Sequence, residues 1–93
     1  MKSKIKIASC CNSESYIFIL DVPVLKEHVK LFEDQGFVVL KHFLNAGILN
    51  ARKKNISFTI TFGQSRMTSR CSGITCPSLW KDLESIINKI EGK

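Results

Sequence analysis

Four cysteines and two histidines are the residues of this chain that could bind a metal ion. The usual zinc knuckle separates its two cysteines by two residues. Cys10 and Cys11 are adjacent instead, and four residues separate Cys71 from Cys76. Neither histidine, at positions 28 and 42, has a second ligand at HxxxH or HxxE spacing. We therefore expect no metal. Ordinary buried thiols are expected for all four cysteines. A disulfide between the Cys10–Cys11 region and the Cys71–Cys76 region is expected only in a hyperthermophile host.

Nucleophilic catalysis is the second chemistry that these side chains could support. A pair such as Cys10 with His42 would need an orienting carboxylate and an oxyanion donor, and nothing in the sequence points to either. The five glycines are scattered and form neither a phosphate-binding P-loop nor a dinucleotide-binding loop. We expect a protein that is not an enzyme and that carries no cofactor.

The basic residues are unevenly distributed along the chain. Fourteen Lys and Arg against eight Asp and Glu give a formal net charge of +6, yet residues 1–35 and 81–93 are each balanced. The excess lies between Gly36 and Trp80, which contains no acidic residue. Its basic residues are Lys41, Arg52, Lys53, Lys54, Arg66 and Arg70. Charge sorted in this way favours a polyanionic partner such as nucleic acid, and the alternative is a solvated basic face.

The elements that must position these residues follow from hydrophobic periodicity. Alternating and β-branched runs at 4–9 and 15–20, around a polar turn at 11–14, predict a hairpin. Further strands are predicted at 37–44, apolar on both faces, and at 48–52, 56–62 and 66–72.

Two helices complete the expected fold. The first covers 23–35, with Asp21 as its cap, Pro23 in its first turn and Gly36 as its left-handed stop. The second begins at Thr75 or Cys76 and carries an apolar stripe. The prediction is one domain, residues 1–93, of the α+β class: a two-layer sandwich with an antiparallel β-sheet and two helices on one face, in the order ββαββββα.

Polar alternation in the later strands defines the candidate site. If their apolar residues face the helices, hydroxyl and arginine side chains share the outer face, where arginine can fork onto phosphate and small hydroxyls allow close approach. Phe37 and Phe43 would join that face if Val38, Leu40 and Leu44 point inward, either to stack on unpaired bases or to be covered by a second subunit. The predicted nucleic-acid-binding residues are Lys41, Arg52, Lys53, Lys54, Ser57, Thr59, Thr61, Arg66, Thr68 and Arg70.

One short segment has a family likeness. Gly73-Ile74-Thr75, followed by Pro77, Trp80 and Leu83, resembles the strand-to-helix end of the small transcriptional-coactivator family that binds single-stranded DNA. That family has no counterpart of the helix expected at 23–35, so the likeness does not assign the chain to it.

The location and the partners complete the expectations. Lys4 and Lys6 interrupt the apolar core that a signal peptide needs, and no apolar run approaches the roughly 18 residues of a spanning helix. We expect no membrane partner and a cytoplasmic location, or the host cytoplasm, because the abundance of Ile, Lys and Ser is typical of viral and mobile-element proteins. The leading hypothesis is a homodimeric nucleic-acid-binding or regulatory protein. The alternative is an inhibitor or adaptor that docks on an acidic protein.

Overall fold

The computed structural model describes residues 2–10 and 13–92, with the backbone alone for residues 8–10. Its sheet has six strands in the order β1-β2-β6-β5-β4-β3, and all neighbours are antiparallel. The strands are β1 (Ser3–Cys10), β2 (Ser13–Ile19), β3 (Val38–Val39), β4 (Ile48–Lys53), β5 (Ile56–Thr61) and β6 (Arg66–Ser72). The helices are the 3₁₀ turn η1 (Lys26–His28), α1 (Val29–Asp34), α2 (Lys41–Leu44) and α3 (Cys76–Ile90).

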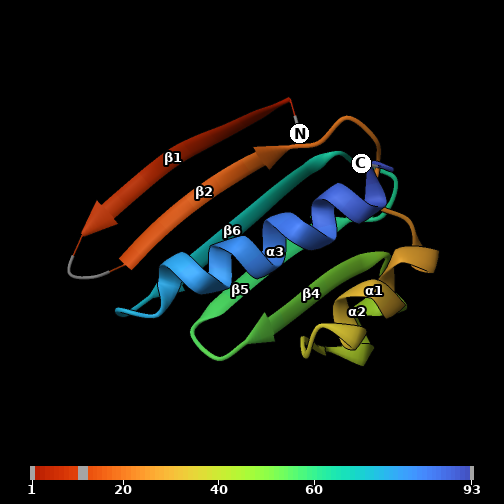
Figure 1. Ribbon diagram of the computed structural model, residues 1–93. Coiled ribbons are helices and arrows are strands. Elements are labelled where there is room, and N and C mark those ends of the chain that lie inside the picture. The colour runs from red at the N-terminus through yellow and green to blue at the C-terminus, as the bar shows by residue number, and fades with distance from the viewer. Residues whose placement is uncertain (1, 11–12, 93) are drawn as a thin grey trace.

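The helices pack on one face of the sheet, which confirms the predicted α+β sandwich. In Figure 1, α3 crosses in front of the sheet, while α1 and α2 lie together beside β4. Strand β5 shows why the chain folds this way: Ile56, Phe58 and Ile60 are buried, whereas Thr59 and Thr61 are exposed on the other side. Each large apolar side chain that is removed from water contributes roughly 1.5 to 3 kcal/mol, so the alternation fixes which face meets the helices.

The apolar stripe of α3 supplies the other half of the core. Leu79, Trp80, Leu83, Ile86 and Ile87 are all buried. Thr75 is the N-cap residue and a proline stands in the first turn, as the sequence predicts. This helix therefore follows the prediction at its start and in its apolar stripe.

The first helix begins later than predicted. The segment before it is extended because Val24 pairs with the loop after β5: its N–H donates to the carbonyl of Gln64, and its carbonyl accepts from Gly63. The buried Val24 side chain strengthens this arrangement. Asp21 and Pro23 therefore do not start a helix, and the helical turns cover 26–34. Gly36, with φ of 91°, ends the segment in the left-handed region as predicted.

The prediction of a strand over 37–44 is wrong for most of that range. Only Val38 and Val39 pair with β4, and α2 begins at Lys41. Phe37 is 4% exposed because its ring packs edge-on against the rings of Phe32 and Phe58. The run 37–44, whose apolar residues would cover both faces of a strand, therefore forms a short strand followed by a helical turn that covers the core.

Two of the four cysteines differ from the expected free thiols. Cys71, at the end of β6, and Cys76, at the start of α3, form a disulfide, and both are buried. The bond joins the sheet to the first turn of α3. The expected turn at 11–14 lies partly outside the described residues.

Candidate functional site

The face of the sheet opposite the helices, here called the open face, carries the side chains that alternate with the core. On β6, Met67, Ser69 and Cys71 are buried, whereas Arg66, Thr68 and Arg70 are exposed on the other side. No helix packs over this face in the part of the chain that the structure describes. The open face is therefore a solvent-exposed surface built from six neighbouring strands.

Strand pairing arranges the open-face residues in rows across the sheet. Ser15 pairs with Arg70, Arg70 with Ser57, and Ser57 with Arg52. The next row contains Ile5, Ile17, Thr68, Thr59 and Asn50. Beyond it, Ile19 pairs with Arg66 and Ile48 with Thr61. Most of the predicted site residues are thus brought onto one surface.

Every arginine of the chain lies on the open face. Arg52 and Arg70 are two strands apart, which corresponds to about 10 Å, and four residues along β6 separate Arg66 from Arg70 by about 14 Å. All three side chains are exposed. The Nε of Arg70 donates to the Oγ of Ser13 at 3.3 Å, which holds that guanidinium over the sheet.

The carboxylates lie elsewhere. Glu14 is on the helix-facing side of β2, opposite Cys71. Five further acidic residues belong to helices, and Glu91 is the C-cap residue of α3. Asp21 follows β2, and its backbone N–H donates to the carboxylate of Glu91 beside the end of α3. The open face therefore contains positive charge with no neutralising carboxylate among the described residues.

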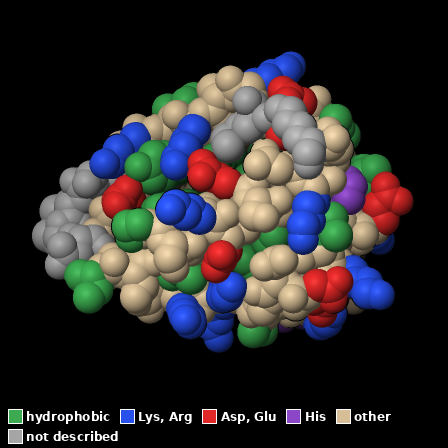
Figure 2. All heavy atoms as spheres, viewed as in Figure 1, with side chains coloured by type: hydrophobic (Ala, Val, Ile, Leu, Met, Phe, Trp, Pro, Cys, Tyr) green, Lys and Arg blue, Asp and Glu red, His purple; other side chains and the backbone are tan. Residues whose placement is uncertain are grey.

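On the helix side, by contrast, lysines and carboxylates neutralise one another. Figure 2 shows this side, with basic and acidic side chains intermingled over α3 and the neighbouring strands. The ion pairs are Lys4 with Glu84 at 3.2 Å, Lys41 with Glu33 at 2.9 Å and Lys53 with Asp82 at 3.0 Å. Three lysines of this side are thus paired with carboxylates of the same molecule.

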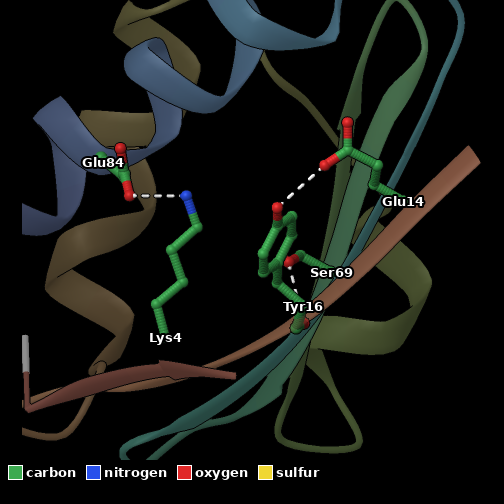
Figure 3. Close-up of polar contacts among 5 residues, drawn as sticks. All are labelled: Lys4, Glu14, Tyr16, Ser69 and Glu84. Carbon is green, nitrogen blue, oxygen red and sulfur yellow. Dashed lines mark hydrogen bonds and ion pairs between the residues drawn. The ribbon is translucent and has the colours of Figure 1, made fainter. Parts of the chain in front are cut away.

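Tyr16 belongs to the same helix-side polar group. Its hydroxyl donates to Glu14 at 2.8 Å, and the ammonium of Lys4 stands 4.6 Å from the centre of its ring (Figure 3). Ser69, although buried, donates to the backbone carbonyl of Tyr16 at 3.0 Å. The hydrogen bond to Glu14, followed by burial and the charge of Glu14, raises the pKa of the Tyr16 hydroxyl.

Three predicted site residues do not lie on the open face. Lys41 is in α2 because the expected strand is a helical turn there. Lys53 points to the helix side, as the next residue after Arg52 in a strand must. Lys54 is exposed in the turn between β4 and β5, with φ of 52°.

The structure also adds residues that the sequence analysis missed. Asn50 on β4 and Ser15, Ile17 and Ile19 on β2 belong to the open face. The alternation of Ser15 and Ile17 with Tyr16 and Phe18 could have placed the β2 residues there. Val38, 59% exposed and opposite Arg52, extends the surface to β3.

The alternative chemistries are separated by the fold. Cys10 belongs to β1 at one edge of the sheet, whereas His42 belongs to α2 beside the opposite edge. Over the described residues, no three or more His, Cys, Asp and Glu side chains gather closely enough to hold a metal ion. Within the same residues, no helix has the length and apolar character needed to cross a membrane.

Comparisons with protein-family models, curated proteins and solved structures gave no match. The function is therefore argued from the open face itself.

Proposed function

We propose that the open face of this protein binds nucleic acid by contacting the phosphate backbone of the nucleic acid. The observation that carries the proposal is the segregation of charge: all three arginines are exposed on a face that has no carboxylate among the described residues. Guanidinium groups make bidentate hydrogen bonds to phosphate. Small side chains between the arginines, such as Ser57, Thr59 and Thr68, leave room for the backbone to approach.

The expected energetics are electrostatic. Affinity falls as salt rises, and each phosphate contact, by releasing condensed counterions, contributes about 0.9 to the size of this negative slope of log affinity against log salt for duplex DNA. Contacts from three arginines predict a slope of about 2.7. Sequence-independent binding of this kind has dissociation constants of roughly 10⁻⁴ to 10⁻⁶ M at physiological salt.

Fluorescence anisotropy with labelled duplex DNA, single-stranded DNA and RNA tests the proposal at about 50 and 200 mM salt. The double variant Arg66→Glu/Arg70→Glu should lose binding. Its matched control is Lys26→Glu/Lys30→Glu, which changes the net charge by the same amount at exposed positions of η1 and α1. If the two variants bind alike, or if the folded wild type binds none of the probes at about 50 mM salt, the proposal is wrong.

A second candidate function has its own supporting observation. Ile5, 50% exposed, and the half-buried Ile17 and Ile19 place an apolar strip beside the arginines. Protein interfaces combine an apolar core with arginine, so the same face could dock an acidic protein as an inhibitor or adaptor. Such a complex should weaken with Ile5→Ser, a change that leaves the arginines and their phosphate contacts in place.

Homodimer formation stays a prediction, through an exposed edge of the sheet rather than through the stretch 37–44. Phe37 is buried, so the stretch 37–44 no longer offers two apolar faces. The outer edge of β1 pairs with no strand among the described residues, and exposed edges favour strand addition. Light scattering at micromolar concentration should report about twice the 10.5 kDa chain mass. A monomer at this concentration would contradict the prediction.

A further inference from the structure

We infer that the nucleic acid is double-stranded and that single strands bind more weakly. The inference rests on the proposed function. It concerns whether the bound nucleic acid is double-stranded or single-stranded, which the positive charge of the open face does not decide by itself.

The first observation is that the open face has no aromatic side chain among the residues that the structure describes. Tyr16, Phe18 and Phe58 point to the helix side of their strands, and Trp80 lies beneath α3 against Tyr16 and Phe18. The remaining four phenylalanines, at 32, 37, 43 and 62, are in or after helices or pack against the core. All eight rings of the chain are accounted for in this way.

Rings matter because proteins that bind single strands stack the bases on aromatic side chains. Each stacked base improves affinity by roughly fivefold to a hundredfold. A sheet face without aromatic rings lacks this increase in affinity for single strands and offers only phosphate contacts. Phosphate contacts favour the duplex, since two strands give a higher charge density than one.

The second observation is the arrangement of the arginines. Arg66 and Arg70 are about 14 Å apart along β6, and Arg52 lies about 10 Å to one side of Arg70. Because the three arginines do not lie in one line, their positions do not match the phosphate backbone of a single strand. They suit two rows of phosphates, such as those on either side of a DNA groove, which is about 6 or 12 Å wide.

The test compares a labelled 20-base-pair duplex with each of its two strands and with oligo(dT) of the same length. The salt slopes should be about 2.7 for the duplex and about 2.1 for single strands. If the affinities for the duplex and for single strands become equal near 1 M salt, these slopes predict that the duplex binds about sixfold more tightly at about 50 mM. Single strands that bind as tightly as the duplex would overturn the inference and leave the proposed function standing. Failure of every probe to bind would instead contradict the proposed function.

A ring placed on the open face tests the reason for the preference. Thr59→Phe puts a strand-compatible side chain at an exposed position in the middle of β5. It should raise the affinity for oligo(dT) by about fivefold or more and lower the affinity for the duplex, because the ring takes up the space that Thr59 leaves for a phosphate backbone. The control, Ser85→Phe, adds the same ring to the exposed side of α3 and should change neither affinity. If Thr59→Phe and Ser85→Phe have the same effect on oligo(dT), missing rings are not the cause and the inference is wrong.

Discussion

The two faces of the sheet are built from the same strands, but they differ in burial and in the distribution of charge. The helix face contains the buried core and the ion pairs of Lys4, Lys41 and Lys53 with carboxylates of the same molecule. The open face contains the three arginines with hydroxyl, amide and isoleucine side chains, and it has no carboxylate among the described residues. We therefore expect changes on the helix face to lower stability, most of all in the core, and changes on the open face to alter binding.

The largest expected effect on stability is at Trp80. It is 6% exposed, and its ring packs edge-on against Tyr16 with the centroids 4.9 Å apart. Trp80→Ala should lower the free energy of unfolding by about 3 to 5 kcal/mol, measured by urea denaturation. Trp80→Phe should cost much less, because it also removes the buried indole N–H, which has no hydrogen-bond acceptor among the described residues. A loss of under about 1 kcal/mol for Trp80→Ala would show that α3 does not carry the core.

The disulfide should come next. In the chain-entropy account, a bond that closes so short a loop stabilises the fold by about 2 kcal/mol. Urea denaturation with and without a thiol reductant measures this contribution. The double variant Cys71→Ala/Cys76→Ala should show no difference between the two conditions. Equal stability of the oxidised and reduced wild type would contradict a stabilising role for the bond.

Two consecutive residues on opposite faces sharpen the comparison. Arg52→Gln should lower the salt slope of duplex binding by about 0.9 and leave stability unchanged. Lys53→Gln breaks the ion pair with Asp82 and should cost under about 1 kcal/mol, because the pair is partly exposed. The slope of this second variant should equal that of the wild type. If Lys53→Gln lowers the slope as much as Arg52→Gln, the two faces do not differ as described.

The smallest expected effect is at Tyr16. The hydrogen bond to Glu14 raises the pKa of its hydroxyl above the ordinary value of about 10. The protonated hydroxyl is therefore favoured in the fold: its contribution is complete below pH 10 and is lost as pH rises through the raised pKa. Tyr16→Phe should cost about 0.5 to 1.5 kcal/mol near neutral pH and less at strongly alkaline pH. Urea denaturation at both pH values measures this difference, and a constant cost would contradict the raised pKa.

Periodicity predicted the parts of the fold in which burial alternates regularly. The rows of the open face follow from strands such as β5 and β6, where every second residue is buried. The start of α3 was equally predictable, since Thr75 and Pro77 are local signals. Arg66, Arg70 and the hydroxyls beside them were therefore assigned to the correct face from the sequence.

The errors occur where distant contacts decide the conformation. Val24 is extended because it pairs with residues 63 and 64, which no local signal at Asp21 could reveal. Phe37 is buried because Phe32 and Phe58 surround it, so an apolar run on both sides did not mean a long strand. The Cys71–Cys76 bond depends on the turn that brings β6 back to α3, and spacing in the sequence does not show it.

The most direct test of the account is nuclear magnetic resonance of the ¹⁵N-labelled protein titrated with a short DNA duplex at low salt. The amide signals of Thr59, Thr68 and Arg70 should shift in proportion to the duplex bound, while those of Lys81 and Ser85 on the exposed side of α3 stay in place. Shifts concentrated on α3, or spread equally over both faces, would contradict the claim that the open face is the binding surface.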